Sequence, residues 1–513
     1  MKFIKLLTIY TMVVLGLFSL SACRRQQGDP RILTYWMPLG QNVSANFTNM
    51  GLTPYGRALQ ERTGIQVEYI HPSGNATEQF NLIIASNDMP DIMEGNWLNY
   101  PGGPENAIAE GVILRLNDIF EQYAPNLMAF LAANPDIDRM IRTDSGSYYC
   151  FPFIRGDFML LLSTGLIVRQ DWLDELGLEL PQTIDDWYSV LSAFRDAKGL
   201  DAPFTNYNLN NMPFAYAFGV IPRNFMIGMD GSIVYSPIED GYRDYLATLA
   251  QWYREGLIDP DILTNNFNAA STKMTRGTSG AVVAPIGSGI GVWTASARQQ
   301  NPSFALAGAP IPVLNRGDRP HLSFAVHPYP GIASAAITAQ ARDIERAARF
   351  LDYSYSEEGM LLNNFGIEGE SFNWVDGYPL YTDFIMQNPN GWPIAQALAA
   401  YARSQAEGPF VQDARFREQY FDLPEQKQAF EAWSFPEMLK HIVPPITPTP
   451  AESAEMARIM SEVNIYQREM ESKFIIGTEP MTNWTTYVTT IRRMNIDRAI
   501  EIMNLALERY NVR

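Results

Sequence analysis

Cysteine, histidine and basic residues are scarce in this chain of 513 residues. It has 2 cysteines and 4 histidines, and 38 Lys and Arg stand against 56 Asp and Glu, for a formal net charge of -18. Such a chain lacks the Lys and Arg patches that neutralise nucleic-acid phosphates, and it lacks the polybasic surface that docks on anionic membranes. The composition therefore excludes nucleic acid as an expected partner.

No apolar run is long enough to span a membrane. Lys2 and Lys5 precede an apolar stretch of 15 residues, 6–20, whereas a spanning helix needs about 20. The apolar stretch ends in small residues before a cysteine, Leu20-Ser21-Ala22-Cys23. This ending is typical of a secretory signal peptide. This ending resembles the bacterial lipobox, which implies cleavage after residues 1–22, a lipid on Cys23 and a tether over 23–30. The alternative, an uncleaved membrane anchor, is disfavoured by the length of the run.

Cys150 would then be the only thiol, so the mature chain can form no intramolecular disulfide. It lies in the apolar sequence Tyr-Tyr-Cys-Phe-Pro, and no histidine is near it in the sequence. Nothing local would lower the thiol pKa, so a buried inert cysteine is expected rather than a nucleophile.

The chain is too long for one hydrophobic core and should form two or more lobes. Apolar runs and helical patterns alternate as in a parallel sheet covered by helices. In the first part, strands are expected at 32–36, 65–70 and 91–93, with helices at 54–63 and 80–85. In the middle, strands are expected at 158–168 and 280–284, and helices at 171–177 and after the capping pair Thr183 and Asp186. The last part should be helical, over 343–356, 449–474 and 496–510.

A search for catalytic residues finds no convincing set. His71, His321, His327 and His441 have no metal-ligand spacing, and structural roles are expected for them. The glycine-rich stretch 287–291 lacks the Lys-Ser/Thr of a phosphate loop. The pair Glu368 and Glu370 could be read as glycosidase carboxylates, but 56 acids create such pairs by chance.

Four ordered stretches carry a family resemblance: 53–92, with EQFNLIIASNDMPDI; 166–178, with LIVRQDWLDELGL; 356–369, with SEEGM and GIEG; and 474–510, with FIIGTEP and ALERY. Together they resemble the extracellular solute-binding lipoproteins of family 1, the carbohydrate receptors of ABC importers. Some large members carry a calcium loop after the helix that follows the Asp-Trp-Leu segment. Residues 195–203 are too short and too poor in alternating acids for such a loop, so no calcium is expected there.

The resemblance implies an α/β, type II periplasmic-binding-protein-like fold, with two discontinuous lobes joined by a hinge. We expect 31–154 with 326–380 in lobe 1, and 155–325 with 381–513 in lobe 2. Crossovers are then expected near 153–158, 320–328 and 370–385.

A sugar site needs aromatic faces for the C–H side of the ring and polar groups for its hydroxyls. Trp97 with Asn96, and Trp36 with Gln41 in the loop that follows it, come at strand ends, where open α/β sheets bind ligands. The remaining candidates lie near the second lobe or the crossovers: Arg155, Ser288, Trp293, Glu370 and Trp374. For each tryptophan, core packing is the alternative role.

The sequence therefore favours a lipid-anchored, monomeric receptor without a cofactor, on the outer face of a bacterial cell membrane. It would capture an oligosaccharide and deliver it to the permease subunits of an ABC transporter. Two alternatives remain open at this point. One is a lipid-anchored glycosidase or lyase, and the other is a binding protein for a peptide or another small solute.

Overall fold

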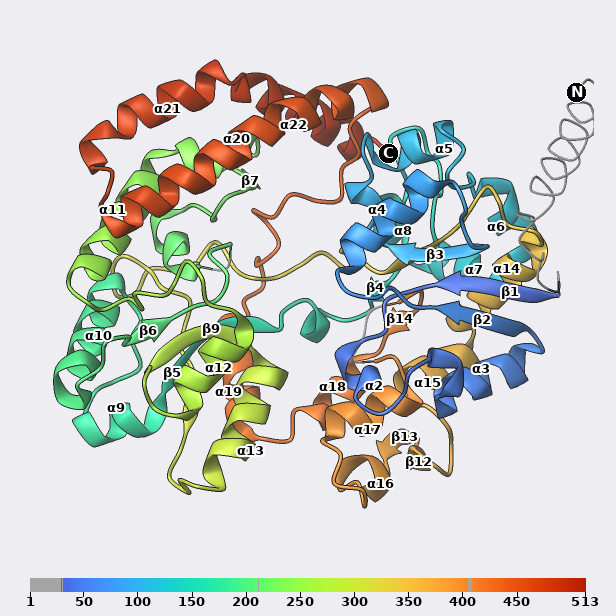
Figure 1. Cartoon of the computed structure of the whole chain (residues 1–513), viewed down its shortest axis with the longest axis horizontal. Coiled ribbons are helices and arrows are strands. Elements are labelled where there is room, and N and C mark those ends of the chain that lie inside the picture. Colours follow the sequence, from blue (N-terminus) through green and yellow to red (C-terminus); the bar gives the residue numbers. More distant parts are fainter. Residues whose placement is uncertain (1–28, 30, 211, 405–407) are drawn as a thin grey trace, which may run out of the picture.

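Two lobes lie side by side in the structure, each with its own sheet and hydrophobic core (Figure 1). The computed structural model describes residues 29, 31–210, 212–404 and 408–513. The expected signal peptide, Cys23 and nearly all of the expected tether lie outside the described residues. No helix within the described ranges is both long and apolar enough to cross a membrane.

The first lobe is built on a four-stranded sheet in the order β11-β3-β1-β2. The strands β1 (Ile32–Trp36), β2 (Gln66–Ile70) and β3 (Ile92–Gly95) are parallel, and β11 (Ser334–Ile337) joins antiparallel from a distant part of the sequence. Helix α3 (Pro54–Thr63) has the expected ends, a Thr53 cap and Gly64 at φ 68°. The other helices of this lobe are α2 (Gln41–Ser44), α4 (Ala76–Ser86), α5 (Gly103–Ala109), α6 (Asn117–Tyr123), α7 (Pro125–Ala133), α8 (Pro135–Ile141), α14 (Ile344–Asp352) and α15 (Glu357–Asn364).

The second lobe has a sheet in the order β10-β5-β9-β6. Its strands are β5 (Thr164–Arg169), β6 (Phe204–Thr205), β9 (Ala281–Pro285) and β10 (Leu306–Gly308), with β7 (Phe225–Ile227) and β8 (Ile233–Tyr235) as a separate hairpin. The strand expected over 158–168 begins only at Thr164, because residues 158–160 form a 3-10 turn capped by Asp157. The helices are α9 (Gln170–Leu176), α10 (Ile184–Lys198), α11 (Asp240–Arg254), α12 (Phe267–Thr275) and α13 (Val292–Arg298).

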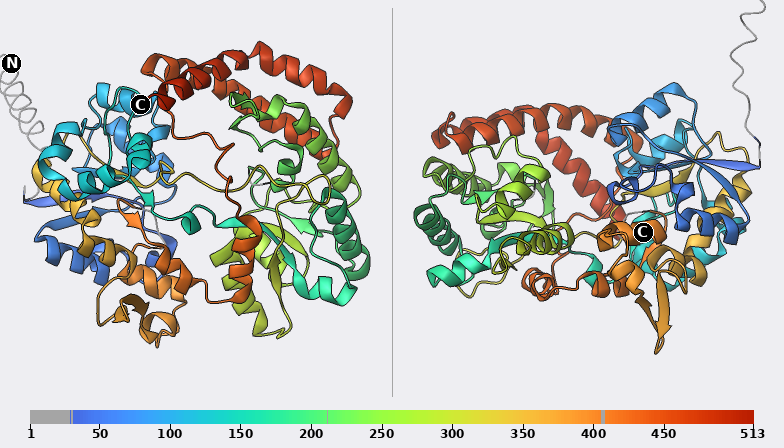
Figure 2. Two further views of the ribbon diagram at one scale, coloured as in Figure 1. Left: turned by 180° about the vertical axis from the view of Figure 1, so that it is seen from behind. Right: turned by 60° about the horizontal axis from the view of Figure 1, so that its bottom comes forward.

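Several segments cross between the lobes (Figure 2). The first follows β4 (Ile154–Arg155), which pairs in parallel with β14 (Val411–Gln412), and the second covers 320–330. The crossover expected at 370–385 is wrong, because that region forms a hairpin of β12 (Phe372–Val375) and β13 (Tyr378–Tyr381) beside α16 (Asp383–Met386). The chain crosses later, between α18 (Ala414–Tyr420) and α19 (Pro424–Trp433).

The expected boundary at residue 380 also falls too early. Helix α17 (Ile394–Tyr401) packs on α2 and α3 of the first lobe, and β14 packs on α15. The apolar face of α17, with Ala397 and Leu398 fully buried, explains why this segment stays with the first lobe.

Three C-terminal helices lie across one side of both lobes, at the top of Figure 1. They are α20 (Pro450–Ile476), α21 (Trp484–Arg493) and α22 (Ile496–Asn511). Helices α20 and α22 lie close to the expected ranges, whereas α21 was not expected. Helix α20 contacts α5 of the first lobe at one end and packs along α11 of the second. At the end of α22, Arg509 and Arg513 both pair with Asp144 of the first lobe. The C-terminal helices therefore tie the lobes together.

Candidate interlobe binding cavity

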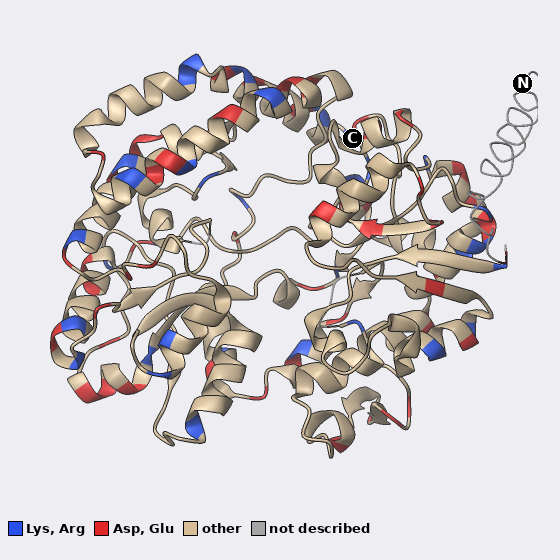
Figure 3. Cartoon of the chain, in the orientation of Figure 1, with Lys and Arg blue, Asp and Glu red and all other residues tan. Residues whose placement is uncertain are grey.

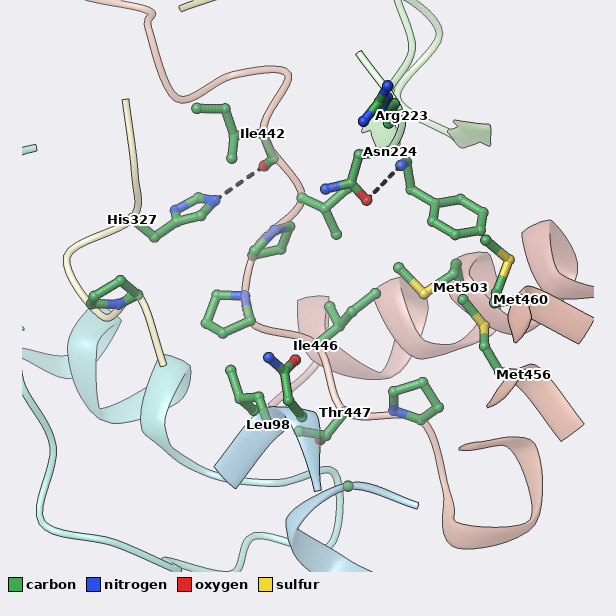
Figure 4. Close-up of a pocket in the computed structure, with 18 of the residues that line it drawn as sticks. Leu98, Arg223, Asn224, His327, Ile442, Ile446, Thr447, Met456, Met460 and Met503 are labelled. Atoms are coloured by element: carbon green, nitrogen blue, oxygen red, sulfur yellow. Dashed lines mark hydrogen bonds between the residues drawn. The ribbon is translucent and has the colours of Figure 1, made fainter. Parts of the chain in front are cut away.

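A cavity of about 1000 Å³ lies between the lobes, and both lobes contribute to its walls. It is lined by the segment after β3, by residues near β7, by α20 and α22, and by two of the crossing segments (Figure 4). Small-molecule sites usually enclose about 300–1000 Å³, so this cavity is at the large end of that range.

The first-lobe wall follows directly from the end of β3. The chain turns through η2 (Trp97–Asn99), and Leu98, Asn99 and Tyr100 line the cavity. Gly102 and Gly103 follow at φ 82° and 75°, the left-handed conformation that glycine adopts at little cost. Tyr100 is held by a hydrogen bond of 2.6 Å from its hydroxyl to Glu110. The strand end thus delivers an amide and a fixed aromatic ring to one wall.

The second-lobe wall is largely one face of α20. Met456, Met460, Asn464 and Arg468 all line the cavity, and their four-residue spacing places them in one row along the helix. Met503 of α22 lies beside the methionines in Figure 4. This wall is apolar near the first lobe and becomes polar toward the second. Flexible methionine side chains adapt their shape to a ligand at little cost.

Arg223 forms a corner of the cavity with an unusual backbone. Its φ of 58° is a left-handed conformation, which is uncommon for a residue with a side chain. The guanidinium Nε donates to Glu471 of α20, and Nη1 donates to Asn210 Oδ1 at 3.3 Å. Burial raises the pKa of Glu471, while the neighbouring Arg223 lowers it. The side chain of Arg223 is therefore held in one orientation from behind.

Two crossing segments form the remaining wall and are hydrogen-bonded to each other: 323–330, and 442–448, where the chain runs from α19 to α20. His327 Nε2 lies 3.1 Å from the carbonyl oxygen of Ile442, the contact drawn in Figure 4. Burial lowers the pKa of His327, so its imidazole is neutral at physiological pH. Pro444, Pro445 and Pro448 stiffen the second segment. The structural roles expected for the histidines are confirmed for His71 as well, which bonds Met37 and Met50 backbone atoms.

The lining combines aromatic and aliphatic faces with hydrogen-bonding groups. Tyr216 and Phe324 add rings from the second lobe side, and Asn210, Asn224 and Ser323 add amides and a hydroxyl. No Asp or Glu is among the described lining residues. Nor do the described parts of the chain bring together three or more His, Cys, Asp or Glu in a way that could hold a metal ion. The chemistry offered is hydrogen bonding and stacking.

None of the nine residues expected at the ligand lines this cavity. Three of the four tryptophans among them are core residues instead: Trp97 is 0% exposed, and Trp36 and Trp293 are 2% exposed. Trp97 packs edge-on against Phe80 at 5.0 Å and donates from Nε1 to the Met93 carbonyl. These three tryptophans are therefore buried and do not line the interlobe cavity.

The other six lie apart from one another. Gln41 is exposed at the start of α2, and Asn96 is half-buried beside η2. Arg155 donates from Nη1 to the Leu160 carbonyl at 2.7 Å, and Ser288 lies in the π-helical turn η6 (Ile286–Gly291). Glu370 and Trp374 are exposed in the β12–β13 region, at the bottom of Figure 1.

At the end of β3 the sequence predicted Trp97 as a ligand contact, whereas the next residue, Leu98, lines the cavity. The cavity-facing residues of α20 were not predicted. The four-residue row on α20 was visible in the sequence, but a row with two methionines is as typical of a core-facing helix. Arg223 gave no signal, because neither its backbone conformation nor its partner Glu471, 248 residues away, can be read from local pattern.

Comparisons with known proteins agree with this architecture. A family model described as Bacterial extracellular solute-binding protein matches residues 47–361. The chain is 27% identical over 240 residues to the fructooligosaccharide ABC transporter substrate-binding protein FusA of Streptococcus pneumoniae serotype 4, covering 42% of this chain and 43% of FusA. Lipoprotein LipO of Bacillus subtilis is 22% identical over 374 residues, 69% of this chain and 70% of LipO. The match to FusA thus spans less than half of that protein.

Solved structures show the same fold over nearly the whole chain. Alginate-binding protein AlgQ2 without calcium ion superposes with a TM-score of 0.76 at 23% identity, covering 94% of this chain and 99% of AlgQ2. FusA in complex with kestose gives 0.75 at 19% identity, with the same coverage. Because the family model spans more than half of the sequence and the two-lobed α/β fold accompanies it, the chain belongs to the bacterial extracellular solute-binding protein family.

Proposed function

We propose that this protein is the substrate-binding component of a bacterial ABC importer and that it captures an oligosaccharide in the interlobe cavity. The observation that carries the proposal is the lining, to which both lobes contribute and which combines rings and methionines with amides and two arginines. Sugars present an apolar face and a belt of hydroxyls, so they need both kinds of group. A ligand that contacts both lobes favours their closure.

The named relatives support a saccharide ligand. FusA is named for fructooligosaccharides, YtcQ of Bacillus subtilis for polygalacturonan and rhamnogalacturonan, and MelE of the same organism for melibiose, raffinose and stachyose. We extend to this chain the saccharide ligand class and delivery to permease subunits from these relatives, and an extracytoplasmic location from the family description. The lipid on Cys23 is proposed from the sequence Leu20-Ser21-Ala22-Cys23, and a monomeric state is proposed with it.

Binding without turnover follows from the same lining. Glycoside hydrolysis generally uses two carboxyl groups on either side of the scissile bond. The described lining residues include none. We therefore infer a receptor and not a glycosidase.

Asn96 is the expected site residue that we retain as a proposed ligand contact. It adjoins Leu98 and Asn99 of the cavity wall, and its Oδ1 is buried with no hydrogen-bond partner among the described residues. A small opening of the lobes would expose this acceptor to a ligand hydroxyl.

The test is a thermal-shift screen of residues 24–513 against oligosaccharides, peptides and small solutes. Ala457 lines the cavity on α20, whereas Ala454, one turn earlier, is exposed outside the lining. A ligand of the folded state raises the melting temperature by mass action. We expect a shift with an oligosaccharide that Ala457→Trp abolishes and Ala454→Trp preserves.

Three results would contradict the proposal. A shift only with peptides or other solutes would move the ligand to another class. A saccharide shift that survives Ala457→Trp would place the site elsewhere. Release of shortened sugars during incubation would make the protein an enzyme.

A further inference from the structure

The only ionised side chains in the described cavity lining are arginines. Arg223 and Arg468 line the cavity, and the lining residue His327 is neutral. The chain has 56 Asp and Glu, but none of them is among the described lining residues. Charges of both signs are spread over both lobes (Figure 3). An acid-free cavity in so acidic a chain therefore sets this surface apart from the rest of the molecule.

Within the part of the chain that the structure describes, no carboxylate pairs with Arg468 to neutralise it. It is exposed on the cavity-facing row of α20, four residues beyond Asn464, and no carboxylate among the described residues forms an ion pair with it. Two nearby arginines of α22 are paired instead: Arg498 with Glu455 at 3.1 Å and Arg509 with Glu452 at 2.6 Å. The guanidinium of Arg468 thus presents its full charge to the cavity.

Arg223 is fixed in place by a buried carboxylate. The side chain of Glu471 is 0% exposed and receives hydrogen bonds from Arg223 and from Gln467 Nε2, the latter at 3.0 Å. A left-handed backbone at a residue with a side chain costs free energy and persists where the surroundings impose it. Because Nε donates to Glu471 and Nη1 donates to Asn210, the guanidinium of Arg223 is held in one orientation at the corner of the cavity where Asn224 also lies (Figure 4).

We propose that the cavity selects an acidic oligosaccharide, one that carries carboxylate or sulfate groups, with Arg468 as the main charge partner and Arg223 as a preoriented second donor. This inference rests on the proposed function and narrows its ligand class. Arginine binds carboxylate and sulfate-like oxygens through two parallel charge-assisted hydrogen bonds. Without a carboxylate in the lining, such a ligand meets no like charge on the wall.

Arginines can also hydrogen-bond neutral sugars, so the test uses paired ligands. Uronate-containing oligosaccharides are compared with their methyl esters, and sulfated ones with their desulfated forms, by isothermal titration calorimetry. Each pair shares ring, linkage and length and differs only in charge. We expect the acidic member to bind at least about tenfold tighter, the factor typical of one charge-assisted hydrogen bond, and to weaken as salt is added.

The matched variants are Arg468→Gln and Arg458→Gln. Arg458 is exposed on the same helix but outside the cavity lining, so both changes remove one charge from α20. Arg468→Gln should cost about tenfold in affinity for the acidic ligand and little for its neutral form. Arg458→Gln should leave both unchanged, and equal melting temperatures of the two variants would exclude misfolding as the cause.

The outcomes separate this inference from the proposed function. Equal or tighter binding of the neutral member, or binding of neutral glycans alone, overturns the acidic ligand and leaves an oligosaccharide receptor. Tight acidic binding that Arg468→Gln does not weaken also overturns the assignment. Failure of every saccharide to bind overturns both.

Discussion

Asp91 holds three separate segments of the first lobe together at the start of β3. It is 2% exposed and accepts hydrogen bonds from the backbone and hydroxyl of Thr34, both at 2.8 Å, and from the backbone and guanidinium of Arg342. Burial raises the pKa of this carboxyl, but the bonds from Arg342 and Thr34 outweigh it and lower the pKa below its usual value. Its negative charge is therefore part of the folded state.

Replacing Asp91 with Asn should destabilise the first lobe by about 2–3 kcal/mol, because the amide nitrogen cannot accept and leaves Arg342 without its counter-ion. Urea unfolding at pH 7 measures this, with exposed Asp201→Asn as the control. Since the folded pKa is lowered, the stabilisation is present above pH 3.8 and is lost as the pH falls through the folded value. A stability difference unchanged at pH 3 would contradict this.

Cys150 offers a chemical test of packing in the first lobe. It is 2% exposed, and burial raises its thiol pKa to about 12. Since the thiolate is the reactive form, we expect no reaction with a disulfide reagent at pH 8 until urea unfolds the protein. Rapid labelling of the native protein would show that the thiol is accessible and ionised.

The role of an individual side chain was harder to predict than the position of a helix cap. Trp97 and Leu98 are neighbours, yet one fills the core behind η2 and the other lines the cavity. A turn rotates successive side chains in directions that its sequence alone does not give. The capping residues are different, because a cap bonds within three residues, and the local pattern is sufficient to identify it.

At the scale of elements, Thr183 and Asp186 show such a cap at the start of α10. The Asp186 backbone donates to Thr183 Oγ1 at 3.1 Å, and the Thr183 backbone donates to Asp186 Oδ2 at 3.0 Å, as the sequence predicts. Helices and strands with clear ends were predicted closely. The lobe to which a peripheral element belongs was not predicted correctly for α17 and the β12–β13 hairpin. Contacts with residues far away in the sequence place these elements.

Thr183→Ala should lower the free energy of unfolding by about 1 kcal/mol, within the usual range of ~0.5–2 for a lost N-cap. Thr248→Ala on α11 is the control, since its exposed hydroxyl bonds only the Asp244 carbonyl of its own helix. Thermal unfolding followed by circular dichroism measures both. Equal effects of the two changes would mean that the cap adds nothing.

At the scale of the whole molecule, Asp144 joins the lobes. It pairs with Arg509 and Arg513 at the end of α22, and its backbone donates to Thr447 of a crossing segment at 3.0 Å. Because α22 also packs on α20 and β8, this carboxylate ties the C-terminal helices to the first lobe. The tie stabilises the arrangement that encloses the cavity.

Asp144→Ala should therefore shift the molecule toward a more open form. We expect a larger radius of gyration in small-angle scattering and an apparent affinity weakened by about threefold or more, because the binding-competent form is less populated. Asp240→Ala is the control, since that residue lies on α11 away from the cavity lining. An unchanged radius and affinity would show that the pairs with Asp144 do not control closure.

Amide hydrogen exchange, measured with and without the oligosaccharide that gives the largest thermal shift, tests the interlobe site most directly. We expect the oligosaccharide to add protection in the segments of both lobes and of the crossing that line the cavity: 98–104, 221–225, 442–448 and 456–468. Protection confined to one lobe, or centred on the β12–β13 hairpin around Trp374, would contradict an interlobe sugar site.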